Sequence, residues 1–505
     1  MKEKRQMTKK RNGKYNNSLC DNTMTFQECE LAVLRQSVDT IEEEQGRRIV
    51  QNDDVKKILE IVETFIVTKK LVCYGGTAIN NILPKNAQFY DKSVDLPDYD
   101  FFSPNALENA KELADIYYKE GYTDVEAKAG VHMGTFKVFV NFIPIADITQ
   151  LVDPLYKSIY KESIMIAGIR YAPPDYLRMG MYLELSRPNG DISRWEKVFK
   201  RLTLLNTHYP MNSGNCHQID LQRDLDSNKE QSEQLYTIAR DTLIAQGVVF
   251  FGGYASSLYS KYTSKLEKQE LKKIPDFDVI TEDINRTAII LKEQLTREGF
   301  KNVKTVANKA IGEIIPESIE VLVGEETIAM LYSPIACHNY NILQIGNNKV
   351  NVATIDTILS FYLSFIYLDS IFHKERVLCM AKYLFDLEQK TRLNQRGLLK
   401  RFSMNCYGKQ TTLEDMRSEK SDKFKELKNN RDSKEYEMWF LRYVPQSIFE
   451  KKQNKLLIKE KEKEKKRVSR IKSKTAKESD MSKSKRSTKK KNPIAKLFNK
   501  LRGSD

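Results

Sequence analysis

The 505-residue sequence predicts an α/β (α+β) fold built from two tandem copies of one domain, each a small mixed sheet flanked by helices. Three pairs of segments repeat along the chain at an offset of 177 or 178 residues: 71–81 with 248–258, 97–103 with 275–281, and 119–129 with 297–307. Three matches in nearly one register indicate a duplicated domain, because the period is too long for a solenoid repeat. Within each copy, apolar runs typical of strands alternate with helical patterns.

The first copy begins with an apolar helical stretch over 55–67, followed by a short buried strand that ends at the pair Gly75-Gly76. After the segment PDYDFFS, Ser103 is expected to cap a helix with Pro104 at its first position. Apolar residues then recur at helical spacing as far as Gly121, which is expected to end the helix.

The second copy repeats this order. A helical stretch over 235–245 leads to a strand that ends at Gly252-Gly253. Thr281 is expected to cap the next helix, and Gly299 to end it. A long apolar helical stretch over 352–388 is expected to pack the second domain together or to form a subunit interface.

Charge is concentrated at the two ends of the chain. The net charge is +15, yet 451–505 alone hold 22 Lys/Arg against 6 Asp/Glu, and 1–25 hold 7 against 2. These ends are predicted to be disordered, because they are polar and almost free of aromatic residues. The predicted organisation is therefore a basic N-terminus (1–25), a catalytic domain (26–215), a second, degenerate domain with a helical C-terminal part (216–450) and a basic tail (451–505).

Composition also excludes some classes of protein. No apolar run reaches the roughly 18 residues of a membrane span, and the N-terminus has no apolar core of a secretory signal. The seven cysteines are scattered and form no CxxC pair. This pattern argues for a reducing compartment and against a disulfide framework or a four-cysteine zinc site.

The segment around Asp98 and Asp100 carries the clearest chemical signal. In an extended strand these two side chains point to the same face, since side chains alternate with a period of two. Two carboxylates on one face can hold divalent ions such as Mg²⁺ next to a phosphate. The alternative is a solvated strand end.

A phosphate site is expected just upstream. Gly75, Gly76 and Thr77 follow a strand and open a helix, where free backbone N–H groups can bind an anion. A tight turn is the alternative for the glycine pair. The combination of the two motifs favours a site that handles phosphate.

Several segments of the sequence resemble those of a known protein family. The segments YGGTAIN, PDYDFFSPN, ELADIYYKEGY, ADITQL, PDYLRMGMYL and SRWEKVFKRL resemble the poly(A) polymerase catalytic subunits of large cytoplasmic DNA viruses, of the poxvirus, asfarvirus and giant-virus type. They also resemble the wider nucleotidyltransferase superfamily that includes DNA polymerase β. The resemblance covers about 55–210 well and the second copy loosely.

The resemblance implies two nucleotidyltransferase-like domains, the second degenerate. It implies template-independent transfer of AMP from ATP to an RNA 3′ end, with release of pyrophosphate and with two Mg²⁺ or Mn²⁺ ions. It calls for a third carboxylate on a later strand, and the matching position is Asp147. The expected catalytic and metal-binding residues are Asp98, Asp100 and Asp147, and the expected nucleotide-binding residues are Gly75, Gly76, Thr77, Arg178 and Lys197.

The expected partners are ATP and the RNA 3′ end, with a possible homodimer and no membrane. The resemblance implies a viral protein of the host cytoplasm and the virion. In the second copy, the repeat offset carries Asp147 onto Glu325, and Glu320 is another substitute. Two alternatives stay open: a nucleotidyltransferase with a tRNA, small-molecule or protein acceptor, and a non-catalytic RNA-binding scaffold.

Overall fold

The computed structural model describes residues 19–20, 23–213, 216, 229–263, 276–367, 374–391 and 393–446. Most of the N-terminus predicted to be disordered, and the whole tail 451–505, lie outside the described residues. The described residues as far as Tyr443 belong to one compact unit. The predicted domain bounds at 215/216 and 450/451 stay predictions.

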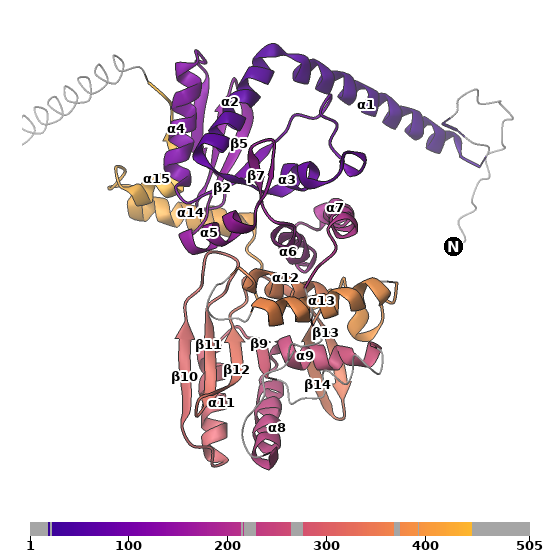
Figure 1. The fold of residues 1–505 in the computed structure, drawn as a ribbon, viewed down its shortest axis with the longest axis vertical. Coiled ribbons are helices and arrows are strands. Elements are labelled where there is room, and N and C mark those ends of the chain that lie inside the picture. The colour runs from indigo at the N-terminus through magenta and orange to yellow at the C-terminus, as the bar shows by residue number, and fades with distance from the viewer. Residues whose placement is uncertain are drawn as a thin grey trace, which may run out of the picture. The chain divides into compact units, whose positions relative to one another are not determined.

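The predicted fold class is confirmed: two mixed sheets, each flanked by helices, follow one another along the chain (Figure 1). The first part of the chain contains α1 (Phe26–Gln51), α2 (Asp53–Lys69), β1 (Val72–Cys73), α3 (Gly75–Ile82), β2 (Tyr99–Ser103), α4 (Ala106–Lys119), β3 (Val125–Ala129), β4 (Thr135–Val140), β5 (Ile143–Gln150), α5 (Asp153–Glu162), β6 (Ile164–Ile166), β7 (Ile169–Tyr171), α6 (Pro174–Leu185) and α7 (Trp195–His208).

The second part contains α8 (Lys229–Ala245), β8 (Val249–Phe251), α9 (Gly252–Tyr259), β9 (Phe277–Ile280), α11 (Ile284–Arg297), β10 (Val303–Asn308), β11 (Ser318–Val323), β12 (Glu326–Tyr332), β13 (His338–Ile345), β14 (Asn348–Ala353), α12 (Ile355–Phe365), α13 (Lys374–Thr391), β15 (Cys406–Tyr407), α14 (Leu413–Leu427), α15 (Lys434–Phe440) and β16 (Arg442–Tyr443).

The order of strands repeats in the two sheets. The first sheet runs β16-β3-β4-β5-β2-β1-β7-β6, and the second runs β10-β11-β12-β9-β8-β14-β13-β15. Seven strands of the first sheet, β1 to β7, have the same neighbours as β8 to β14 in the second. The sequence repeat therefore corresponds to a repeat of topology.

The C-terminal segment returns to the first sheet. Strand β16 pairs with the edge strand β3, so that Arg442 lies opposite Lys128. Lys111 on α4 forms an ion pair of 2.7 Å with Glu437 on α15, and the Tyr443 hydroxyl donates to Asp115. Residues beyond 406 thus complete both sheets, since β15 pairs with β13 of the second.

Two of the predicted helix starts were wrong. Ser103 is the last residue of β2, and Asn105 caps α4, with the Asn105 N–H donating to Ser103 Oγ at 2.9 Å. In the second copy the cap is Asp283 rather than Thr281. Gly121 and Gly299 follow the helix ends with positive φ, as expected of residues that end a helix. The stretch predicted to be helical from 352 begins as the end of β14 and becomes α12 only at Ile355.

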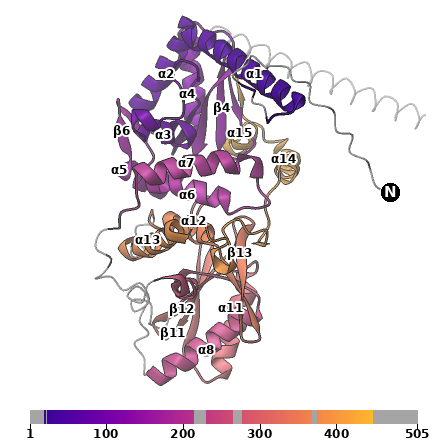
Figure 2. The same cartoon turned by 90° about the vertical axis from the view of Figure 1, so that its right-hand side faces the viewer.

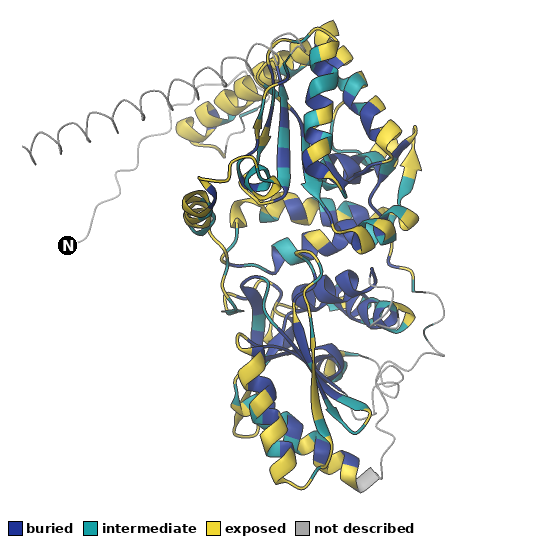
Figure 3. Ribbon diagram, turned by 90° about the vertical axis from the view of Figure 1, so that its left-hand side faces the viewer, coloured by how far each residue is buried: buried dark blue, intermediate teal, exposed yellow. Residues whose placement is uncertain are grey.

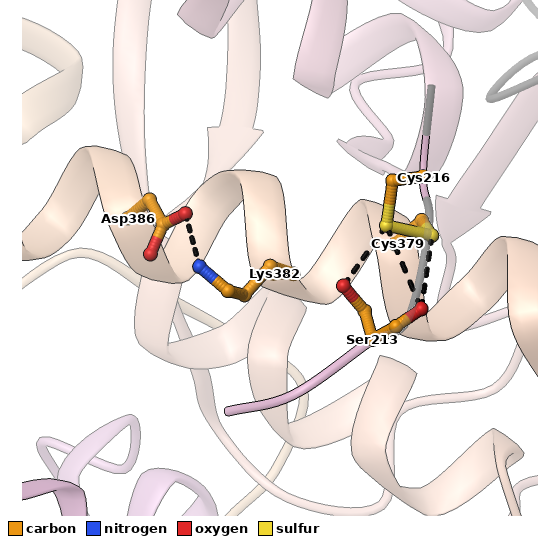
Figure 4. The surroundings of a disulfide bond; sticks show 5 residues. All are labelled: Ser213, Cys216, Cys379, Lys382 and Asp386. Carbon is orange, nitrogen blue, oxygen red and sulfur yellow. Dashed lines mark hydrogen bonds and ion pairs between the residues drawn. A yellow bond between two sulfur atoms is a disulfide. The ribbon is translucent and has the colours of Figure 1, made fainter. Parts of the chain in front are cut away.

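The prediction against disulfides was also wrong. Cys20–Cys29, Cys216–Cys379 and Cys337–Cys406 are bonded, with Cα atoms 5.2 to 5.6 Å apart, and Cys73 is free and buried. Two of the pairs join cysteines 69 and 163 residues apart, so the fold brings them together and sequence spacing could not show it. Figure 4 shows the disulfide between Cys216 and Cys379 of α13. Ser213 Oγ lies 2.9 Å from Cys216 Sγ.

The buried core continues from one sheet to the other through α12. Every residue of α12 is buried, and the helix packs against α6 and α13 (Figures 2 and 3). Beside it, Arg401 donates to Asp356 of α12 at 2.9 Å and pairs with Glu388 of α13 at 2.6 Å. Tyr182 of α6 donates to Glu388 at 3.1 Å, so one buried network joins the two halves.

No helix in the described part of the chain has the length and apolar content to cross a membrane.

We expect Arg401→Met to lower the free energy of unfolding by about 3–5 kcal/mol, because it leaves two buried carboxylates without their cation. Urea denaturation, monitored by circular dichroism, measures this free energy of unfolding. The control is Lys400→Met, at an exposed neighbouring position, where a change within about 0.5 kcal/mol is expected. Equal effects of the two variants would contradict the structural role of Arg401.

Candidate active site

Two of the predicted carboxylates meet across neighbouring strands. Asp100 on β2 lies directly opposite Asp147 on the parallel strand β5. Residues in register on adjacent strands present their side chains to the same face of the sheet. Asp98 directly precedes β2, so it stands at the end of the same strand. The structure therefore brings the three predicted residues to one place.

The glycine pair lies against these carboxylates. The Tyr74 N–H donates to the Asp100 carbonyl at 2.9 Å, and Gly75 follows with a φ of +73°. A Cβ at Gly75 would lie 2.5 Å from Asp100 Oδ2, so only glycine fits there. Gly75 and Gly76 open α3, whose N-terminus has no side-chain cap. Its first backbone N–H groups are available to an anion next to the carboxylates.

Thr77, the third residue of this predicted phosphate site, is buried, and its hydroxyl donates to the Asp98 carbonyl at 2.7 Å. This bond ties the first turn of α3 to the segment that carries Asp98. In the structure Thr77 positions the carboxylates, and its hydroxyl proton is already engaged.

The crowding of negative charge perturbs the carboxylates. Burial, followed by the charges of Asp98 and Asp147, raises the pKa of Asp100 to about 7. Loss of surrounding water, followed by the charge of Asp147, also raises the pKa of Asp98. Lys137 opposes both shifts, lies opposite Asp147 on β4 and forms an ion pair with it. The site holds more negative charge than its protein cation can neutralise.

This excess charge fits a divalent cation. Carboxylate oxygens are the ligands that Mg²⁺ and Mn²⁺ prefer, and a bound cation would favour the charged form of these carboxylates. Over the described residues, no three His, Cys, Asp or Glu side chains are already arranged as a metal-binding group. Asp147 is instead turned to Lys137. The residue types fit the metal, and Lys137 engages Oδ2 of Asp147 in this structure.

Arg201 was not among the nucleotide-binding residues expected from the sequence. A Cβ at Gly76 would lie 2.9 Å from Arg201 Nη1 and 2.7 Å from the Tyr90 hydroxyl, so this guanidinium lies at the N-terminus of α3. Arg201 donates to the Tyr90 hydroxyl at 2.7 Å and stacks over Phe89 with its guanidinium carbon 4.7 Å from the ring centroid. A close cation and free N–H groups together suit a phosphate chain.

The two basic residues preferred from the sequence lie differently. Arg178 is only 1% exposed and donates to Asn206 at 2.7 Å, to Asp175 and to the Tyr209 carbonyl. These bonds hold α6 to α7. Lys197 is exposed on α7, and its spacing from Arg194 and Arg201 places all three on one side of the helix. The roles of Arg178 and Lys197 in nucleotide binding stay predictions.

The second copy keeps the strand order but not the carboxylate pair. Asp278 on β9 lies opposite Met330 on β12, the position that Asp147 occupies in the first sheet. Neither substitute suggested by the sequence fills it: Glu325 lies in the turn between β11 and β12, and Glu320 lies opposite Met330 on β11. Asp276 is paired with Arg376 at 3.5 Å.

Comparison with known proteins agrees with this contrast between the copies. Residues 60–191, which contain Gly75, Asp100 and Asp147, match the family described as poly(A) polymerase catalytic subunit. A protein of African swine fever virus (strain Badajoz 1971 Vero-adapted), named as a candidate poly(A) polymerase catalytic subunit, is 33% identical over 165 residues, 31% of this chain and 34% of its own. One of Acanthamoeba polyphaga mimivirus with the same name is 33% identical over 161 residues, covering 31% of this chain and 27% of its own.

The matched segment thus spans about a third of the length of these relatives. A solved structure, the Megavirus polyadenylate synthase, aligns with 90% of this chain and 92% of its own at a TM-score of 0.71. At 18% identity, this match shows a shared fold. The resemblance to viral poly(A) polymerase catalytic subunits is confirmed over 60–191, and the fold over nearly the whole chain.

We expect Asp100→Asn to stabilise the protein at alkaline pH when divalent ions are chelated. Folded Asp100 keeps its proton up to about pH 7, whereas the unfolded chain releases it near pH 4, so stability falls as the pH rises between these values. The Asp100→Asn variant does not lose stability in this way, because it has no carboxyl group at this position. Its advantage in free energy of unfolding should grow by on the order of 2 kcal/mol from about pH 5 to about pH 8.

Thermal and urea denaturation in EDTA at the two pH values measure this difference. Asp39→Asn on the exposed surface of α1 is the control. An advantage that does not change with pH would show that Asp100 is not held protonated by its neighbours.

Proposed function

We propose that this protein is a poly(A) polymerase, which transfers AMP from ATP to the 3′ end of RNA without a template and releases pyrophosphate. One observation carries the proposal: Asp100 and Asp147 lie opposite each other next to the glycine-opened helix α3. This arrangement stands within 60–191, the segment that matches the poly(A) polymerase catalytic subunit family.

The carboxylates and the start of α3 have separate roles in the proposed reaction. Two Mg²⁺ or Mn²⁺ ions would supply the Lewis-acid chemistry that activates a 3′ hydroxyl and stabilises the leaving pyrophosphate. Asp98, Asp100 and Asp147 are the residues that would hold them. The N-terminal N–H groups of α3, at Gly75 and Gly76, and the guanidinium of Arg201 would bind the triphosphate.

Lys137 has a different part in this scheme. It neutralises Asp147 when no cation is bound, and so keeps three neighbouring carboxylates compatible with a folded sheet. Arg194, which lowers the pKa of Asp100, adds positive potential from the start of α7.

The homodimer is proposed on the evidence of α1. Leu31, Leu34, Val38 and Ile41 recur at three- and four-residue spacing on this helix and are all more than a third exposed. Such a stripe suits the same helix of a second copy. Sedimentation velocity tests this: a dimer is expected, and Leu34→Glu/Ile41→Glu should return it to a monomer. A wild-type monomer at micromolar concentration would contradict it.

A location in the host cytoplasm and the virion is also a proposal, supported by the viral relatives alone. The three disulfides suit an oxidising environment better than a reducing one. A count of free thiols in the protein from virions and from infected cytoplasm distinguishes an oxidising from a reducing environment. Only the oxidised protein has Cys73 as its single free thiol.

We expect Asp98→Asn/Asp100→Asn to reduce RNA extension more than about 100-fold, since the metal ligands are lost. A labelled RNA primer with Mg²⁺ and each nucleoside triphosphate in turn measures this. The matched control is Asp276→Asn/Asp278→Asn in the second copy, which should retain extension and should extend with ATP alone.

Three results would redirect the proposal. Equal losses in both variants would mean that the copies share the reaction. Use of another nucleotide, or of a different acceptor, would favour the other nucleotidyltransferase reactions. RNA binding without any extension by the wild type would favour the scaffold.

We expect Arg201→Ala to raise KM for ATP by about tenfold or more, because a hydrogen bond to a charged group contributes about 1.5–3 kcal/mol. Steady-state extension at varied ATP measures it. The control is Lys200→Ala, one residue earlier on α7, where the lysine is exposed and paired with Glu196. A change in kcat alone would place Arg201 outside the nucleotide-binding step.

A further inference from the structure

A hollow lies on the first domain, away from the carboxylates. It encloses about 580 Å³ between the end of α2, the start of α4 and α5. Its wall contains Lys69, Lys70 and Lys157 together with Tyr156 and Tyr160, and no carboxylate lines it.

This hollow is at the opposite end of the strands from the candidate active site. Lys70 and Leu71 precede β1, whereas Gly75 follows it; Pro104 follows β2, whereas Asp98 precedes it. At about 3.3 Å per residue, the four steps from Asp100 to Pro104 correspond to roughly 13 Å. A ligand bound there cannot be the nucleotide or the 3′ hydroxyl that reacts at the carboxylates.

The hollow carries positive charge that its neighbours do not neutralise. Lys69 forms an ion pair of 2.6 Å with Glu112. For Lys70 and Lys157, which are exposed, the described residues offer no ion pair. Two uncompensated ammonium groups beside one cavity favour an anion such as a phosphate diester.

The same wall offers a stacking surface. Tyr156 and Tyr160 lie one turn apart on α5, with ring centroids 6.1 Å apart and planes 29° from parallel. Arg170 lies over the Tyr160 ring at 4.3 Å. Lys157 and Lys161 form a parallel row one residue further on, so α5 presents an aromatic row beside a basic one. Aromatic side chains next to backbone-binding cations are typical of single-stranded nucleic-acid sites.

We propose that this hollow is a second RNA site, which binds single-stranded RNA upstream of the 3′ end through phosphate contacts to Lys70 and Lys157 and base stacking on Tyr160. This inference rests on the proposed function, since it gives the RNA substrate a second point of attachment. Its consequence is that a primer long enough to reach both sites stays bound between successive additions.

A comparison within the same chain sharpens the proposal. A hollow of about 570 Å³ on α11 is lined by Lys292, Arg297 and Glu293, with no aromatic residue. It is similar in volume to the hollow beside α5 and also offers two cations that can be replaced, Lys292 and Arg297, but the residues that line it include no aromatic side chain for stacking. Lys292→Ala/Arg297→Ala is therefore the control for loss of charge alone.

The first test measures RNA binding by fluorescence anisotropy at several salt concentrations. EDTA is present, so that no extension takes place. Lys70→Ala/Lys157→Ala should weaken binding of a long single-stranded RNA at least tenfold and reduce the slope of log affinity against log salt by about 1.4. Tyr160→Leu should weaken it about fivefold or more with an unchanged slope. The α11 control should do neither, and thermal denaturation checks that each variant is folded.

The second test is extension with an excess of primer. The Lys70→Ala/Lys157→Ala protein should add the first nucleotide to a short primer at the wild-type rate but make shorter products from a long one. Unchanged affinity and product length, or an equal loss in the α11 control, would overturn the second site. If neither the wild type nor any variant extends RNA, but the affinity still falls as expected, the second RNA site is supported and the proposed polymerase activity is contradicted.

Discussion

The structure of the candidate site depends on the register between β2 and β5. This register sets Asp100 opposite Asp147, so two carboxylates share one face at the edge of a hydrophobic core. Burial of Asp100, followed by the charges of Asp98 and Asp147, raises the pKa of its carboxyl group. Lys137 on β4 and Arg194 at the start of α7 are the cations that oppose this shift.

The second copy has the same topology but lacks the pair of carboxylates that face each other across neighbouring strands. Its strands pair in the same order, and Gly252 still packs against Asp278, yet Met330 stands where the first copy has Asp147. With Asp276 paired to Arg376, the acidic residues there are partly neutralised within the protein. The duplicated sheet has kept its architecture, and α12 and the Arg401 network join it to the first domain.

Much of the fold and site could be predicted from the sequence, because the repeat and the motifs are local patterns. Gly75, Asp98 and Asp100 are close in sequence, and their juxtaposition follows from a strand, a turn and a helix. The helix cap at Asn105 was missed because Ser103 is held in β2 by pairing with β5. Contacts between distant segments were beyond reach: Arg201 beside Gly76, Met330 opposite Asp278, and disulfides over 69 and 163 residues depend on the completed fold.

We propose that the first copy alone holds the catalytic cations. Electron paramagnetic resonance of Mn²⁺, with a non-hydrolysable ATP analogue, counts the ions bound per chain. We expect two ions for the wild type and for Asp278→Asn, and a loss of tight binding for Asp100→Asn. Tight binding that survives Asp100→Asn but is lost in Asp278→Asn would contradict it and move the catalytic centre to the second sheet.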